Sequence, residues 1–191
     1  MRIGVLALQG AFAEHIFVLK KLGIETVELR KKSNLDMSLD GLVLPGGEST
    51  TQGKLLRELG MYDTIKEWIQ KGIPVFATCA GMILLAEDIS NDERSYFRTL
   101  PVTVKRNAYG RQLGSFRCME DFKGIGKIPM TFIRAPYIED VGKDVEVMAE
   151  VDGNIVAVRY GKQLALSFHP ELDDSRLIYE YFIEEIVNVN R

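Results

Sequence analysis

The stretch PVFATCAGMILLA, residues 74–86, gives the clearest indication of the fold class. Its first half is a short apolar run that predicts a buried strand over 73–78, and its second half predicts a helix that begins at Cys79. A strand followed by a helix is the repeating unit of α/β proteins with a parallel sheet. A sharp turn between the two elements exposes the turn residue at the end of the sheet.

The same alternation runs through the first half of the chain, and the second half departs from it. Strands are predicted at 2–8, 24–30, 41–47 and 73–78, and helices at 12–22, 50–59, 61–71 and 79–86. Short strand-like segments follow at 100–106, 113–119, 129–135, 145–151, 154–160 and 163–168, with a hairpin signal at 152–154 and a closing helix at 175–187. The pattern predicts a parallel sheet with helices on both faces, in one domain of residues 1–191.

Composition narrows the class of protein. The 191 residues are 46% hydrophobic and 27% charged with a net charge of -3, which is ordinary for a globular protein and argues against nucleic-acid binding. No apolar run is long enough to span a membrane, and Met1 leads directly into a strand without a signal peptide. The two cysteines form no CxxC pair and have no metal-ligand spacing with the two histidines. We expect a cytoplasmic protein with free thiols, no metal and no membrane.

Cys79 lies where a nucleophile would be exposed. Ala77 and Gly81, two residues before and after it, are the small neighbours that a tight strand-to-helix turn needs. The helix N-terminus favours a negative charge on sulfur, and the N–H of Ala80 is expected to face a developing oxyanion. Free cysteines are also often buried and inert, so this segment alone leaves both interpretations open.

The segment LALSFHPELDD, residues 164–174, offers a base for this thiol. If the segment is extended, His169 and Glu171 share a face, and the carboxylate holds one ring nitrogen while the other takes a proton from a thiol. His169 packed against its proline is the alternative. We interpret His15 as a structural or surface residue and Cys118 as a core or edge residue.

Six motifs carry a resemblance to a known family. They are GVLALQGAFAEH (4–15), LPGGESTT (44–51), TCAGMILLA (78–86), RNAYGRQ (106–112), FIRAP (132–136) and SFHPEL (167–172). Together they resemble the glutaminase subunits of pyridoxal 5′-phosphate synthase, which are class I, or triad-type, glutamine amidotransferases. The resemblance implies a flavodoxin-like three-layer sandwich with a few antiparallel strands in its second half. It also implies hydrolysis of L-glutamine to L-glutamate and ammonia without a cofactor.

The resemblance also implies a glutamine pocket, whose residues would be Gly47, Glu48, Ser49, Arg106, Ile133 and Arg134. Their chemistry fits: an arginine fork suits the α-carboxylate of glutamine, and Glu48 can accept from its ammonium group. The backbone N–H groups of Gly47 and Ala80 would form the oxyanion hole. PGGES can also be an ordinary strand-to-helix turn with Ser49 or Thr50 as the N-cap.

The ammonia would pass to a (β/α)₈-barrel synthase subunit. By resemblance, Gln9 and Gly10 lie at the interface with this partner, next to the Gly46–Gly47 peptide. We expect the free chain to hold that peptide with its carbonyl turned toward the oxyanion site, and docking to turn it.

Three alternatives remain. The chain could be the glutaminase subunit of another amidotransferase, although RNAYGRQ and FIRAP argue against this. It could be an elbow-cysteine stress protein or deglycase, a class that lacks His-Pro-Glu after the final strand. It could also be a binding module that kept the fold, which the complete Cys79, His169 and Glu171 set argues against.

Overall fold

The structure is a computed structural model and describes residues 1–108 and 114–190. The strands of this part are β1 (Arg2–Leu6), β2 (Glu25–Leu29), β3 (Gly41–Leu44), β4 (Val75–Thr78), β5 (Ala86–Ile89), β6 (Leu100–Lys105), β7 (Ser115–Phe122), β8 (Gly126–Ile133), β9 (Tyr137–Val141), β10 (Glu146–Val151), β11 (Asn154–Tyr160) and β12 (Gln163–Leu166). The α-helices are α1 (Phe12–Lys21), α2 (Ser49–Glu58), α3 (Tyr62–Gln70), α4 (Ala80–Leu85) and α5 (Leu177–Phe182). Shorter helical turns are η1 (Lys32–Leu35), η2 (Pro170–Leu172), η3 (Ile183–Val187) and η4 (Asn188–Asn190).

A ten-stranded sheet forms the centre, in the order β2-β1-β3-β4-β12-β11-β9-β6-β5 with β10 beside β11. The pairs from β2 to β12 are parallel, as the apolar runs predict, and β3 and β4 are buried along their whole length. The pairs around β11 and β9 are antiparallel. The expected mostly parallel sheet with some antiparallel strands is confirmed.

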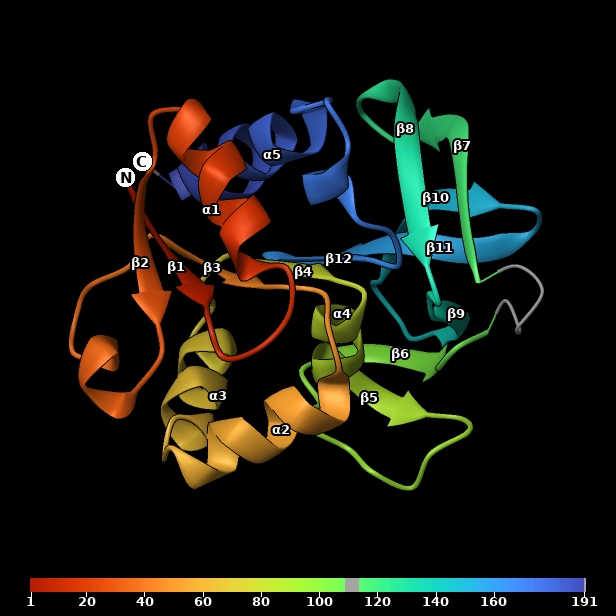
Figure 1. Cartoon of the computed structure of the whole chain (residues 1–191). Coiled ribbons are helices and arrows are strands. Elements are labelled where there is room, and N and C mark those ends of the chain that lie inside the picture. Colours follow the sequence, from red (N-terminus) through yellow and green to blue (C-terminus); the bar gives the residue numbers. More distant parts are fainter. Residues whose placement is uncertain (109–113, 191) are drawn as a thin grey trace.

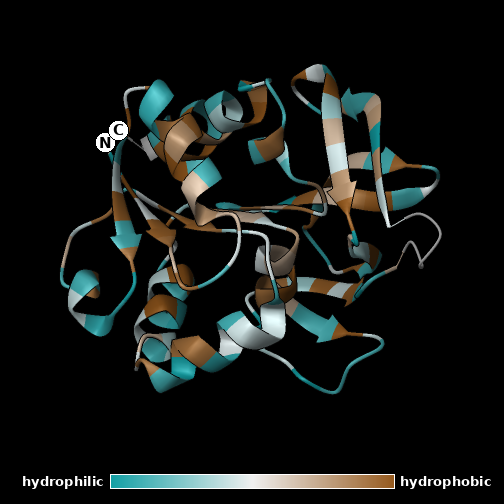
Figure 2. Ribbon diagram, in the orientation of Figure 1, coloured by the Kyte–Doolittle hydropathy of each residue, from teal (hydrophilic) through white to brown (hydrophobic). Residues whose placement is uncertain are grey.

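Helices cover both faces of this sheet (Figure 1). α1 and α5 lie on one face with a core that includes Leu19 and Phe182, and α2, α3 and α4 lie on the other with a core that includes Leu56 and Ile65. Figure 2 shows α4 as largely hydrophobic and η1, at the margin, as largely hydrophilic. Burial on both faces explains why the central strands have no polar alternation. None of the described helices is long and apolar enough to span a bilayer.

The second half differs from expectation in several places. β5 and β9 were not predicted, because their short segments AEDI and YIEDV are rich in acidic residues. β7 and β8 form a separate two-stranded sheet, and β7 begins at Ser115, while residue 113 of the predicted strand lies outside the described residues. The predicted closing helix is not uniform, because α5 continues as the π-helical turn η3.

The pairing of β12 with β4 builds the site. The two strands are parallel, with Leu166 opposite Thr78, and the N–H of Cys79 donates to the carbonyl of Leu166 at 2.7 Å. The carboxyl ends of both strands therefore meet at one edge of the sheet. Residues far apart in sequence, Cys79 after β4 and His169 after β12, are brought together there.

Candidate active site

Cys79 occupies a strained turn between β4 and α4. It is the N-cap residue of α4 with φ 46° and ψ -101°, a conformation that side-chain-bearing residues rarely adopt. Gly81 allows the turn, since a Cβ there would lie 2.0 Å from the carbonyl oxygen of Leu44. The predicted elbow is therefore present, and the free thiol lies at the first turn of a helix, where peptide N–H groups are unpaired.

His169 and Glu171 contact each other, but not in the way we expected. His169 Nδ1 lies 2.6 Å from Glu171 Oε1. The expectation of an extended segment is wrong: Pro170–Leu172 is the 3₁₀ turn η2, which curls the carboxylate back onto the ring. The backbone N–H of His169 donates to the carbonyl of Thr131 on β8 at 2.8 Å and so anchors the turn.

Charge interactions around His169 stabilise its protonated form. Burial alone would lower the pKa of His169, but hydrogen bonds to Cys79 and Glu171 outweigh burial and raise the pKa to about 10. Burial also opposes ionisation of Glu171, yet His15 and His169 together lower the pKa of this carboxyl. The three side chains of Cys79, His169 and Glu171 thus form one hydrogen-bonded series in a largely buried setting.

The loop after β3 packs against this series. A Cβ on Gly46 would lie 2.3 Å from His169 Cε1 and 3.4 Å from Cys79 Cβ, so only glycine fits there. The carbonyl of Gly46 accepts a hydrogen bond from the N–H of Ala11 at 3.0 Å. This contact holds the Gly46 carbonyl against the loop after β1, and the expected turn of the Gly46–Gly47 peptide on docking stays a prediction. In a trans peptide the N–H of Gly47 points opposite to that carbonyl, away from Ala11.

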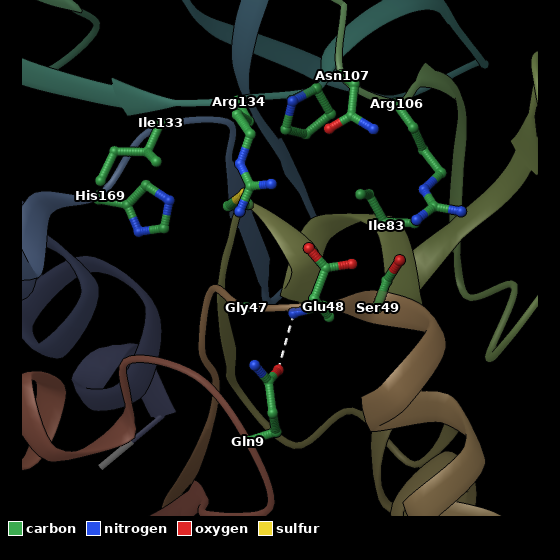
Figure 3. A pocket seen from close by; sticks show the side chains of 12 residues that line it. Gln9, Gly47, Glu48, Ser49, Ile83, Arg106, Asn107, Ile133, Arg134 and His169 are labelled. Carbon is green, nitrogen blue, oxygen red and sulfur yellow. Dashed lines mark hydrogen bonds between the residues drawn. The ribbon is translucent and has the colours of Figure 1, made fainter. Parts of the chain in front are cut away.

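A cavity of about 170 Å³ opens beside Cys79 and His169. Its lining consists of Gln9, Gly47, Glu48, Ser49, Cys79, Ile83, Arg106, Asn107, Ile133, Arg134, Pro136 and His169. Figure 3 shows the Arg134, Glu48 and Ser49 side chains directed into the space between the walls. Pockets for drug-sized ligands are roughly 300–1,000 Å³, so this cavity suits a smaller molecule with charged ends.

Arg106 is held in the wall by an acidic partner that the sequence did not reveal. Its guanidinium pairs with the carboxylate of Asp92, which also accepts from Arg94 at 2.6 Å. Hydrogen bonds from Arg94 and then Arg106 outweigh burial and keep the pKa of Asp92 well below its usual value. Both guanidinium groups also reach the hydroxyl of Thr50, at 3.0 Å from Arg94 and 3.5 Å from Arg106.

The structure brings all six expected pocket residues to one cavity, and Ala80 follows Cys79 directly. Gln9 also lines the cavity, and its side-chain oxygen accepts from the N–H of Glu48 at 2.8 Å (Figure 3). The N-cap residue of α2 is Glu48, not Ser49 or Thr50, and no side chain caps this helix. Part of the motif at 106–112 lies outside the described residues.

Several residues that line the cavity or support the triad were not predicted from the sequence. Ile83 lies one turn after Cys79 on α4, a spacing that could have indicated its place in the wall. Asn107 and Pro136 follow Arg106 and Arg134 in loops, where sequence gives no direction. His15, interpreted as structural or as a surface residue, is fully buried behind Glu171, with Nε2 3.5 Å from Oε2. Cys118 lies on β7, partly buried, and is absent from the described cavity lining.

Comparison with known proteins decides the family. Residues 5–188 match the SNO glutamine amidotransferase family. This chain belongs to that family. A curated relative from Desulfitobacterium hafniense, a pyridoxal 5′-phosphate synthase subunit PdxT, is 61% identical over 97% of this chain and 94% of its own length. A relative of the same description from Haemophilus influenzae is 57% identical over 96% of this chain and 97% of its own length. Another from Methanocorpusculum labreanum is 55% identical over the whole length of both chains.

Solved structures agree with this assignment. A crystal structure described as a glutamine amidotransferase matches with a TM-score of 0.91 and 46% identity, over 98% of this chain and 99% of that one. A glutamine amidotransferase from Thermotoga maritima has a TM-score of 0.64 at 18% identity, over 97% of this chain and 84% of that one. The second match supports the fold alone. The flavodoxin-like three-layer arrangement of the SNO family is therefore the fold of this chain.

Proposed function

We propose that residues 1–191 are one amidotransferase domain, which hydrolyses L-glutamine through a triad of Cys79, His169 and Glu171. The observation that carries the proposal is the position of His169, which is hydrogen-bonded to both Cys79 and Glu171 at the wall of a small charged cavity. The family and its near relatives support glutamine as the substrate. The two free thiols favour a reducing, cytoplasmic setting.

The proposed reaction assigns one role to each residue of the triad. Cys79 Sγ attacks the side-chain amide carbon of glutamine, and His169 holds the proton that leaves the thiol. The N–H groups of Gly47 and Ala80 stabilise the oxyanion of the tetrahedral intermediate. Collapse of that intermediate breaks the C–N bond, and His169 returns its proton to the departing ammonia. His169 then takes a proton from water, whose oxygen attacks the thioester and releases glutamate and the thiol.

Glutamine is held at its charged end by the opposite wall. Arg106 and Arg134 would bind the α-carboxylate, and the Glu48 carboxylate would accept from the α-ammonium group. Ser49 Oγ is buried and has no hydrogen-bond partner among the described residues, so it is available to the substrate. Ile133, 36% exposed at the cavity, would cover the aliphatic part of glutamine.

The ammonia is proposed to pass to a (β/α)₈-barrel subunit that makes pyridoxal 5′-phosphate, since relatives bear the description of a synthase subunit. The loop after β1 is a suitable place for that partner to act. Gly10 is exposed there, while the Gln9 side chain reaches the N–H of Glu48 in the glutamine pocket. A contact on this loop would therefore be transmitted to the pocket, and we expect the partner to raise glutaminase activity.

Glutamine hydrolysis by Cys79 variants tests the proposal. Cys79→Ala should release no ammonia from glutamine while keeping its fold by circular dichroism and its binding to the barrel subunit. Cys118→Ser is the matched control, because Cys118 lies outside the cavity, and it should stay within a few-fold of wild type. Normal ammonia release by Cys79→Ala would refute the nucleophile. Equal wild-type activity with and without the barrel would refute activation by the partner.

A further inference from the structure

A second histidine stands behind the proposed triad. His15, on α1, is fully buried, and its Nε2 lies 3.5 Å from Glu171 Oε2. Glu171 uses its other oxygen, Oε1, for His169 and makes no hydrogen bond with Oε2 among the described residues. A separation of 3.5 Å is long for a hydrogen bond but short enough for electrostatic attraction. Oε2 thus depends on His15 for stabilisation of its charge.

The proton position on His15 is set by Tyr179. The phenol oxygen of Tyr179, on α5, lies 2.7 Å from His15 Nδ1. Burial raises the pKa of Tyr179 well above its ordinary value, so the hydroxyl is protonated and can donate to Nδ1. Burial also lowers the pKa of His15, so the ring is neutral, and because Nε2 faces a carboxylate oxygen that can only accept, we assign the single proton to Nε2. That N–H faces Glu171 Oε2.

The same N–H reaches the loop of the oxyanion site. His15 Nε2 lies 3.2 Å from the hydroxyl oxygen of Thr78, the last residue of β4. That hydroxyl oxygen accepts the N–H of Gly46 at 2.9 Å. One buried side chain therefore contacts both the carboxylate of the triad and the hydroxyl that holds the Pro45–Gly46 peptide.

We propose that His15 is a positioning residue for glutamine hydrolysis: its Nε2–H, fixed by Tyr179, holds Glu171 and, through Thr78, the Gly46 loop. The inference rests on the proposed triad, because it assigns His15 a role through Glu171. His15 is absent from the described cavity lining, so we assign it no contact with glutamine. Its loss should lower kcat and leave KM unchanged.

The ionisable groups around Glu171 determine how kcat/KM should depend on pH when His15 is replaced. The titratable groups around His15 and Glu171 are His169 after β12, Tyr179 on α5, Glu14 on α1 and Cys79 at the elbow. The Nε2–H of neutral His15 faces Glu171 Oε2, and its dipole favours the ionised carboxylate, so loss of His15 should raise the pKa of Glu171. Glu171 is then protonated at a higher pH, and the acid limb of the kcat/KM profile moves upward.

Substitutions at His15 separate positioning from packing. His15→Leu leaves a buried carboxylate oxygen without its partner and should lower kcat by about 5- to 100-fold. His15→Gln keeps an N–H near the position of Nε2 and should recover a large part of the loss. Leu19→Ala, a buried change on the same helix, is the control; it should lower Tm but leave kcat per folded molecule and the acid limb unchanged.

Nitrogen NMR tests the proton position without relying on activity, and the spectrum of the wild-type protein needs no variant to fold. The chain has two histidines, so a protein labelled with ¹⁵N-histidine gives two ring systems. His15 should be a neutral Nε2–H tautomer across neutral pH in wild type, and Tyr179→Phe should lose this single tautomer.

Two results would overturn the proposal: a cationic or Nδ1–H His15 in the wild-type spectrum, or a His15→Leu enzyme with the wild-type acid limb. Retained activity in Cys79→Ala would instead refute the triad itself and leave the His15 spectrum unchanged. Failure of the proposed function and failure of this inference are therefore distinguishable.

Discussion

Gly46→Ala tests how tightly the site is packed. The added Cβ would lie 2.3 Å from His169 Cε1 and 2.9 Å from Nδ1, whereas ordinary contact begins at 3.4 Å. The imidazole or the loop must therefore shift by about 1.1 Å, the difference between 2.3 Å and 3.4 Å. The loop resists, because Gly46 donates to Thr78 Oγ1 at 2.9 Å and accepts from Ala11 at 3.0 Å.

The imidazole is the part that yields, and its shift breaks the 2.6 Å contact with Glu171 or its alignment with Cys79. Misplacement of a catalytic group by about 1 Å costs about 10²-fold in rate. We expect Gly46→Ala to lower kcat by about 10²-fold in a coupled glutamate assay, with a normal circular dichroism spectrum. Gly23→Ala is the control: its positive φ costs about 1 kcal/mol of stability, but it lies far from the site. A Gly46→Ala enzyme with kcat within about twofold of wild type would refute the packing argument.

Three further predictions address the roles of individual groups. Glu171→Gln should lower kcat greatly but less than His169→Ala, because orienting a base contributes less than being one; equal activity of Glu171→Gln and wild type would refute its role. Arg106→Ala and Arg134→Ala should each raise KM for glutamine by about 10- to 150-fold through loss of a charge-assisted bond worth about 1.5–3 kcal/mol, and an unchanged KM would remove that arginine from the carboxylate site. His169 has a pKa raised from 6.5 to about 10, so its contribution to the free energy of unfolding should be complete below pH 6.5 and disappear as pH rises through about 10. Urea unfolding across this range measures the effect, and Cys79→Ala, which lacks one of the two hydrogen bonds, should show a smaller fall.

The sequence predicted the parallel half of the fold well for a physical reason. Strands buried on both faces, such as β3 and β4, are continuous apolar runs and stand out from their surroundings. β9, with the sequence YIEDV, is partly exposed, and its polar residues give no continuous apolar run by which a strand could be predicted. The elbow at Cys79 was predictable because small neighbours and a strand-to-helix change are local features.

The contacts between distant segments were less predictable. The contact between His169 and Glu171 was expected correctly, but its cause is the 3₁₀ turn after His169 and not an extended strand. Asp92 holds Arg106 from another loop, and only tertiary structure reveals the pair. His15 lies on the buried face of α1 beside Ile16 and Leu19, which indicates burial, but its contact with Glu171 depends on how α1 packs against η2.

Covalent labelling by a glutamine analogue with an electrophilic carbon in place of the amide tests directly whether Cys79 is the nucleophile. We expect one adduct per chain, located by peptide mass spectrometry on Cys79 and absent from Cys118, with loss of ammonia release in step with labelling. Glutamine in excess should protect Cys79 from the reagent. Labelling of Cys118, or full hydrolysis of glutamine by a chain already modified at Cys79, would show that Cys79 is not the nucleophile.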